Sequence, residues 1–289
     1  MMPDAPTQPS SMTGLEFQVF RDLVHRETGI ALGPHKRTLL EARLTKRLRA
    51  LRLPSFSAYL EVLRRHDPQG EERTRFVNAI TTNETAFFRE QVHFTYLASE
   101  WLPARRARAS ATGDRTIRIW AAACSTGEEP YSIAMTILAG MDTLAWDVRI
   151  LASDIDTDVL DRAAAGVYTN DAAAVVPTPL LHRFFLRGVG PRSGMVRVRP
   201  EVRSLVTFRH INLLETPWPI RSRFDLIFCR NVLMYFDRPT QIQIVTRLAQ
   251  HLVPGGLLAL GHAENLLGLA TDMRRVTSTI YRHAEAPPA

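Results

Sequence analysis

The chain has little cysteine and lacks both a long apolar run and a secretory signal. Cys124 and Cys229 are its two cysteines among 289 residues, and they form no Cys-x-x-Cys pair, which favours reduced thiols over a disulfide. No apolar run reaches the roughly 18–20 residues that span a bilayer. The N-terminus shows no basic segment followed by an apolar one. We therefore expect a cytoplasmic protein without membrane insertion.

Several common catalytic motifs are also missing. The sequence contains no Gly-x-x-x-x-Gly-Lys-Ser/Thr loop, no His-Glu-x-x-His and no Gly-x-Ser-x-Gly. Its nine histidines do not cluster at the spacing of metal ligands. These absences weigh against an ATPase, a hydrolase and a metalloenzyme, and we expect no metal site.

What is present is an ordinary globular composition with an excess of positive charge. Apolar residues make up 45% of the chain, and the formal net charge is +7. The charge suggests an acidic partner, but it does not distinguish nucleic acid, a membrane surface and protein. The length allows one large domain or two smaller ones.

The first part of the chain has a helical pattern. Residues 1–12 are rich in Pro, Ser and Thr, and we expect a disordered tail there. Residues 13–82 repeat apolar residues at helical spacing and predict an all-α N-terminal domain. Its predicted helices span residues 13–28, 35–53, 55–65 and 71–80. Residues 83–114 are expected to form a linker and a connecting helix.

From residue 115 to 285 strand-like and helical runs alternate, which predicts an α/β domain with a mostly parallel sheet covered on both faces. The predicted strands span 116–121, 148–152, 206–210, 225–229 and 257–261, with an antiparallel edge strand at 277–282. The predicted helices span 129–138, 159–165 and 240–252. A glycine-rich turn inside 183–203 predicts a hairpin, and hence a small β-insertion over about 180–204.

The most informative segment is residues 123–132, Ala-Cys-Ser-Thr-Gly-Glu-Glu-Pro-Tyr-Ser, which follow the first predicted strand. A strand, a tight turn at Gly127 and a helix N-terminus are typical of a nucleotide-type cofactor site. Phosphate prefers bare backbone N–H groups, yet Glu128 and Glu129 stand where a phosphate would lie. The loop therefore favours a cofactor with hydroxyls or positive charge.

Other polar residues follow the predicted strands. Asp154 ends the second strand, where such folds hold ribose hydroxyls, although Asp154 or Asp156 could instead cap the next helix. Arg230 and Asn231 follow the strand at 225–229 and should face the crevice at the carboxyl ends of the sheet.

Two further features are ambiguous when each is taken alone. Tyr235 reads as a half-buried packing residue. Residues 82–89 read as a helix start with Asn83 as its N-cap.

Together these segments resemble the CheR-type chemoreceptor glutamate methyltransferases. The likeness runs in order from about residue 15 to residue 283. The matching motifs are Thr82-Asn83-x-Thr85-x-Phe87-Phe88-Arg89, Ser125-Thr126-Gly127-Glu128-Glu129-Pro130-Tyr131-Ser132, Ala152-Ser153-Asp154-Ile155-Asp156, Asn212-Leu213-Leu214, Phe228-Cys229-Arg230-Asn231-Val232 and Gly261-His262-x-Glu264-Asn265.

The resemblance implies a Rossmann-like methyltransferase domain behind the helical domain, with S-adenosylmethionine as cofactor and glutamate side chains of chemotaxis receptors as substrate. The cofactor contacts that it implies are Asn83, Thr85, Arg89, Glu128, Asp154, Asn212, Leu213, Arg230 and Asn231. It places Arg89 and Tyr235 near the transferred methyl group as catalytic residues, and it reverses the isolated interpretation of residues 82–89. Glu129 is then expected to serve the helix N-terminus.

The resemblance also implies protein partners. The basic helix at 35–52, on which Lys36, Arg43, Lys46 and Arg47 share a face, is expected to dock on the receptor's helical bundle. The hairpin at 183–203 is expected to bind a peptide at the receptor's C-terminus.

Two rival functions are a nucleic-acid methyltransferase and a non-catalytic cofactor-binding module. Amino-methylating enzymes of the first kind usually carry Asp/Asn-Pro-Pro-Tyr/Phe where this chain has Cys229-Arg230-Asn231-Val232. We therefore expect no nucleic-acid partner. The second function is disfavoured by the presence of Arg89, Glu128, Asp154, Asn231 and Tyr235.

Overall fold

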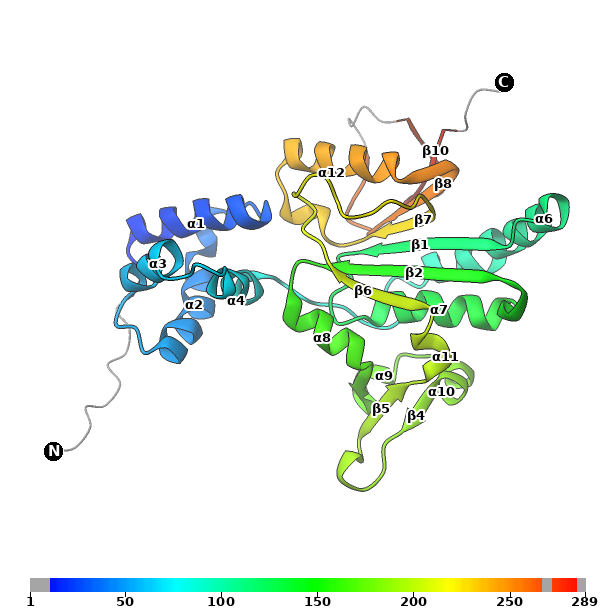
Figure 1. Cartoon of the computed structure of the whole chain (residues 1–289), viewed down its shortest axis with the longest axis horizontal. Helices are drawn as coiled ribbons and strands as arrows, with labels where there is room; N and C mark the ends of the chain where they lie inside the picture. The colour runs from blue at the N-terminus through cyan, green and yellow to red at the C-terminus, as the bar shows by residue number, and fades with distance from the viewer. Residues whose placement is uncertain (1–10, 267–271, 285–289) are drawn as a thin grey trace.

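The computed structural model describes residues 11–266 and 272–284, and its N-terminal part is entirely helical (Figure 1). The helices of this part are α1 (Gly14–Thr28), the short η1 (Pro34–Lys36), α2 (Arg37–Leu51), α3 (Phe56–Arg65) and α4 (Glu71–Ile80). These bounds confirm the four predicted helices. Most of the expected disordered tail, 1–12, lies outside the described residues, whereas Met12 at its end is fully buried.

Local signals in the sequence set the limits of α1. The Thr13 side chain accepts a hydrogen bond from the Glu16 main chain, and the Glu16 side chain accepts one from the Thr13 main chain, which completes a capping box. Gly29 ends the helix in the left-handed conformation, at φ 73°. The apolar faces of the four helices then meet in one core around Phe20 and Tyr59.

Several basic side chains of α2 serve this helical part. Arg47 binds the buried Glu72 through two hydrogen bonds of 3.0 and 2.6 Å. Arg43 donates to the main-chain oxygen of Ile80 and to Thr82. The basic face predicted on this helix is therefore partly occupied by contacts within the protein.

The segment after α4 is extended and irregular up to residue 91, and a helical run follows. The run consists of α5 (Val92–Tyr96), the π-helical η2 (Leu97–Trp101) and α6 (Leu102–Thr112). Asn83 caps no helix, since its side chain donates to Asp156 instead. The isolated interpretation of 82–89 as a helix start is therefore wrong.

The second part of the chain contains a seven-stranded sheet in the order β6-β2-β1-β7-β8-β10-β9. Its strands are β1 (Thr116–Ala122), β2 (Asp147–Asp154), β6 (Val206–His210), β7 (Phe224–Cys229), β8 (Leu252–Leu260), β9 (Met273–Arg275) and β10 (Ile280–His283). The first five pair in parallel, and β10 runs antiparallel to β8 and β9. The predicted α/β class is confirmed. The last strand, β10, is antiparallel as predicted. It is not the edge strand of the sheet, because β9 pairs with its other side.

Helices cover both faces of this sheet. Figure 1 shows α12 (Arg238–Gln250) on one face and α7 (Glu128–Gly140) and α8 (Thr157–Ala165) on the other. Ile119 and Trp120 are neighbours on β1, yet Ile119 packs in the core on the α7 side and Trp120 in the core on the α12 side. This alternation is what a strand buried on both faces requires.

A small antiparallel sheet is inserted after α8. It has the order β3-β5-β4, with β3 (Val167–Thr169), β4 (Phe185–Arg187) and β5 (Met195–Val198). The predicted hairpin is confirmed in β4 and β5, but β3 was not predicted, and Arg183 belongs to a helix. The remaining short helices are η3 (Thr143–Ala145), α9 (Asn170–Ala173), α10 (Thr178–Phe184), η4 (Gly190–Arg192), α11 (Pro200–Arg203) and η5 (Leu233–Tyr235).

Candidate cofactor and active site

A cavity of about 350 Å³ lies between the helical N-terminal part and the carboxyl ends of β1, β2, β6 and β7. Such an edge is where open α/β sheets bind ligands. The predicted site residues that line it are Asn83, Thr85, Arg89, Asp154, Asn212, Leu213, Arg230, Asn231 and Tyr235. Nine of the ten predicted positions are thus brought together, and Glu128 is the exception.

The loop after β1 is held by Asp154. One carboxylate oxygen of Asp154 accepts from the Ser125 main-chain N–H at 2.8 Å, and the other accepts from that of Asp156 at 3.0 Å. Gly127 is required at the turn because its φ is 95° and an added Cβ would lie 2.8 Å from Ala163. Burial raises the pKa of Asp154. Through these two hydrogen bonds Asp154 shapes the loop, and it also lines the cavity.

Asp156, not Asp154, caps α8. Its Oδ1 accepts from the main-chain N–H groups of Asp158 and Val159 at 2.9 and 3.3 Å. Its Oδ2 accepts from Thr81 at 2.7 Å and from Asn83 at 2.6 Å. The capping alternative left open by the sequence thus applies to Asp156, which also ties the interdomain segment to the sheet.

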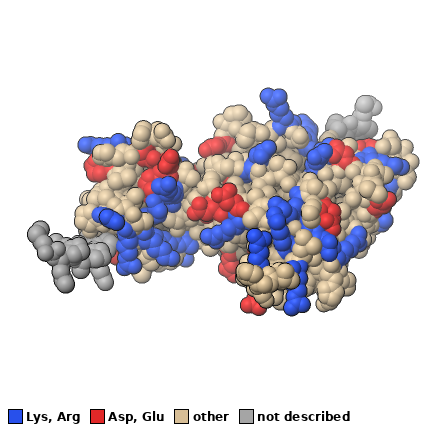
Figure 2. Space-filling view, turned by 60° about the horizontal axis from the view of Figure 1, so that its bottom comes forward, with Lys and Arg blue, Asp and Glu red and all other residues tan. Residues whose placement is uncertain are grey.

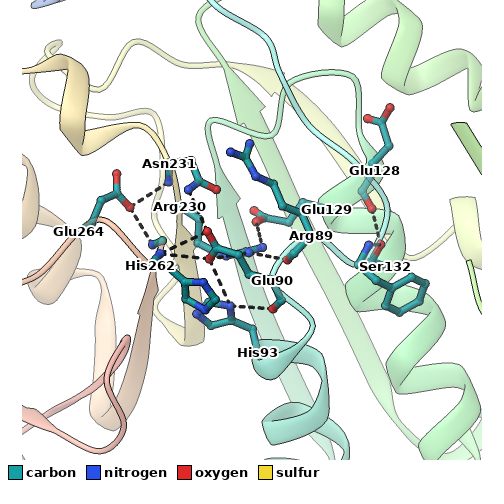
Figure 3. A network of polar contacts seen from close by, with 12 residues as sticks. Arg89, Glu90, His93, Glu128, Glu129, Ser132, Arg230, Asn231, His262 and Glu264 are labelled. Carbon is teal, nitrogen blue, oxygen red and sulfur yellow. Dashed lines mark hydrogen bonds and ion pairs between the residues drawn. The ribbon is translucent and has the colours of Figure 1, made fainter. Parts of the chain in front are cut away.

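The two glutamates at the start of α7 face different surroundings. Glu129 lines the cavity, whereas Glu128 does not. The Glu128 carboxylate accepts from Thr126 at 2.7 Å, and Figure 3 shows it pointing away from the polar cluster. Successive residues on a helix point about 100° apart, so only one of the pair can face the site. Glu129, not Glu128, therefore lines the cavity, and its lining gives no support to the predicted contact through Glu128.

A buried ion network centres on Arg230, whose side chain is 2% exposed (Figure 3). Its Nη1 donates to Glu129 at 2.8 Å, and its Nη2 donates to Glu90 at 3.0 Å and to the main-chain oxygen of Arg89 at 2.5 Å. The guanidinium thus joins the helix after β1, the loop after β7 and the segment that carries Arg89. Its charge is turned toward these groups, so Arg230 organises the site. Arg230 also lines the cavity, and its expected contact with the cofactor stays a prediction.

The loop after β7 is fixed by Glu264. This buried carboxylate accepts from the main-chain N–H groups of Asn231, Leu233 and Gly261 at 2.9, 2.7 and 2.7 Å. These contacts place Asn231 and, in η5, Tyr235 at the cavity. The sequence alone assigned no role to Glu264, although this residue stands in a matching motif. It also did not point to Glu90, which directly follows the motif that ends at Arg89. The position of each acid in or next to a matching motif is the signal that could have identified it.

The helical N-terminal part closes one side of the cavity. The Asn212 side chain donates to the main-chain oxygen of Glu27 at 2.8 Å, and the Ala31 N–H donates to that of Tyr235 at 2.8 Å. Ile30 forms an isolated β-bridge with Phe236. A ligand in the cavity would therefore contact both parts of the chain.

The lining suits S-adenosylmethionine. Asp154 can accept hydrogen bonds from hydroxyl groups, the Glu129 carboxylate offers negative charge to a cationic ligand, and apolar side chains such as Ile155 and Ile211 can cover a base. The described residues contain no group of three or more His, Cys, Asp and Glu that could hold a metal ion. Fold and site together define a Rossmann-like, cofactor-binding enzyme.

Comparison with known proteins gives the family. Residues 83–282 match the family model described as CheR methyltransferase, SAM binding domain, and residues 15–81 match CheR methyltransferase, all-alpha domain. The chain belongs to the CheR methyltransferase family, and S-adenosylmethionine is its cofactor.

Named relatives cover nearly the whole chain. Chemotaxis protein methyltransferase 2 of Pseudomonas aeruginosa is 48% identical over 93% of this chain and 93% of its own length. The chemotaxis protein methyltransferase of Escherichia coli is 42% identical over 95% of this chain and 93% of its own length. Within the ranges 11–266 and 272–284, no helix is long and apolar enough to cross a membrane.

His93 lies behind the ion network, and its protonation tests how deeply the network is buried. The residue is 1% exposed, its Nδ1 lies 3.2 Å from the main-chain oxygen of Glu90, and its ring stacks on His262. Burial, followed by the charge of Arg230, lowers the pKa of His93 to about 4. His93 is therefore neutral at neutral pH.

Because the unfolded chain binds this proton near pH 6.5 and the folded protein only near pH 4, stability is lost as the pH falls through that window. The wild type should lose about 3 kcal/mol more than His93→Gln between pH 6.5 and pH 4. Urea unfolding at several pH values measures the difference, with His66→Gln, at an exposed position, as control. Parallel pH dependence of wild type and His93→Gln would contradict the assignment.

Proposed function

We propose that the protein is a cytoplasmic protein-glutamate O-methyltransferase that methylates glutamate side chains of chemotaxis receptors. The observation that carries the proposal is that Arg89 and Tyr235 line the same cavity as Asp154 and Asn212. A cation able to hold a substrate carboxylate thus lies beside the residues expected to hold the cofactor.

The chemistry of the substrate fits this lining. When bound, S-adenosylmethionine supplies a methyl group on a positively charged sulfur. A glutamate carboxylate, with a pKa near about 4.3, is already ionised at neutral pH and needs no general base. Accordingly, no histidine is among the described residues that line the cavity.

Arg89 is suited to orient the carboxylate. Its Nη1 donates to the main-chain oxygen of Glu84 at 2.7 Å, which leaves other N–H groups of the guanidinium for a ligand. Because charge disappears as a carboxylate becomes an ester, tight pairing would stabilise the ground state more than the transition state. We therefore assign Arg89 to placement of the nucleophile, which can contribute several kcal/mol. Tyr235 could donate a hydrogen bond to the same carboxylate or face the sulfonium.

The position of α2 supports docking of an acidic receptor segment. Lys36, just before α2, and Leu39 at its start line the cavity, while Lys46 and Arg49 are exposed further along the helix. Figure 2 shows Lys and Arg side chains gathered on the helical part at the left of the view. With Arg47 held by Glu72, the docking surface that we propose consists of Lys36, Lys46 and Arg49 rather than the whole predicted face.

The inserted sheet supports a second contact with the receptor. Within the described residues β4 is an edge strand, and such an edge can add a peptide as a further strand. Leu186 of β4 is 42% exposed, and Val189, just beyond the strand, is 80% exposed. Arg187 of β4 and Arg192 in the following turn are exposed as well. We propose this edge as the place where a peptide from the receptor's C-terminus binds.

The reaction is tested with methyl-labelled S-adenosylmethionine and receptor-containing membranes. We expect base-labile label on the receptor, as a carboxyl methyl ester requires. Arg89→Ala should lower the rate about 100-fold while the circular dichroism spectrum stays unchanged, because misplacing the nucleophile costs that order of rate. Label on added nucleic acid would support the rival methyltransferase, and cofactor binding without any transfer would support the non-catalytic module.

Docking through α2 makes a separate prediction. Lys46→Ala together with Arg49→Ala should raise the receptor KM about tenfold at low salt and leave kcat unchanged, because exposed charges steer and hold an acidic partner. The effect should fade at about 0.5 M salt. The matched control removes two exposed charges from α6, with Arg106→Ala and Arg108→Ala. An equal effect of both pairs, or a salt-insensitive KM, would refute docking through α2.

A further inference from the structure

The ion network behind the cavity contains more negative than positive charge. One guanidinium, that of Arg230, contacts two carboxylates, those of Glu129 and Glu90, at 2.8 and 3.0 Å. His93, next to them, is neutral at neutral pH because its pKa is lowered to about 4. Burial raises the pKa of Glu129, and the contact with Arg230 opposes that shift. With Glu129 ionised, one positive charge faces two negative ones in a region where all four side chains are largely buried.

The two carboxylates lie at different depths. Glu129 lines the cavity, whereas Glu90 does not. Glu90 is held behind Arg230 by the Asn231 side chain at 3.1 Å and by the His262 main-chain N–H at 3.2 Å (Figure 3). Although burial opposes it, these donors and Arg230 lower the pKa of Glu90 to about 2, so Glu90 carries its charge at neutral pH.

Glu90 thereby changes what Arg230 can do for Glu129. With Glu129 as its one carboxylate partner, Arg230 would neutralise the acid at the cavity wall. Because Glu90 attracts the same guanidinium from behind, the group keeps a net negative charge next to the cavity. Charges in a poorly hydrated site act more strongly than the same charges in water.

We propose that Glu90 is a positioning residue that, through Arg230, keeps the Glu129 side of the cavity negative and so lets the site distinguish the cationic methyl donor from its neutral product. S-adenosylmethionine carries a sulfonium, and S-adenosylhomocysteine carries an uncharged thioether in the same place. The inference rests on the proposed assignment of this cavity as the cofactor site. It gives a role to a residue that contacts neither ligand.

The test compares the dissociation constants of both ligands by calorimetry at pH 7.5. Glu90→Gln keeps the shape of the side chain and removes its charge. We expect the ratio of the S-adenosylmethionine constant to the S-adenosylhomocysteine constant to rise about tenfold in this variant, since one nearby charge is lost. The control, Glu100→Gln, removes an exposed carboxylate ten residues along the chain and should leave the ratio unchanged.

The outcomes separate the inference from the function on which it rests. An equal loss of both affinities in Glu90→Gln would show a structural role only and would overturn the inference, while the proposed function would stand. Failure of the wild type to bind either ligand would overturn both. If Glu90→Gln does not fold, Glu129→Gln removes the other carboxylate of the same guanidinium, and its ratio must rise too. An unchanged ratio there would overturn the inference.

Discussion

The buried contact of Arg230 with Glu129 and Glu90 is the interaction on which the site depends. It joins the helix after β1, the loop after β7 and the segment between the two parts of the chain. Breaking such a buried pair typically costs about 3–5 kcal/mol, because the remaining charge is left without a partner. The network therefore acts as a single unit, and the position of Arg89 follows from it through the main-chain contact with Arg230.

Carboxylates also maintain the strained backbone around the cavity. Glu90, Ser125 and Asn231 have φ values of 57°, 48° and 57°, which residues other than glycine seldom adopt. Each such residue costs about 1–3 kcal/mol and persists only where its surroundings hold it. Asp154 holds the Ser125 N–H, and Glu264 holds that of Asn231. These acids thus shape the loops that border the cavity.

Much of this arrangement follows from local sequence patterns, and the remainder depends on contacts between distant residues. Helical and strand periodicity predicts α1–α4 and the parallel strands, because the spacing of apolar residues along the chain shows whether an element buries one face or both. The choice between Glu128 and Glu129 depends on the rotation of α7, which a one-residue difference in the helix start changes. The role of Glu90 depends on Arg230, 140 residues away. The short β3 has too few residues for a periodic signal and forms only against β5.

We propose that the cofactor binds between the helical part and the sheet, against Glu129 and Asp154. A crystal structure with S-adenosylhomocysteine tests this most directly. We expect the ligand in the cavity that Asn83, Asn212 and Asn231 line, with Glu129 at its wall and the Arg230 contacts intact. A ligand bound outside this cavity, or one that contacts Glu128 in place of Glu129, would contradict the account.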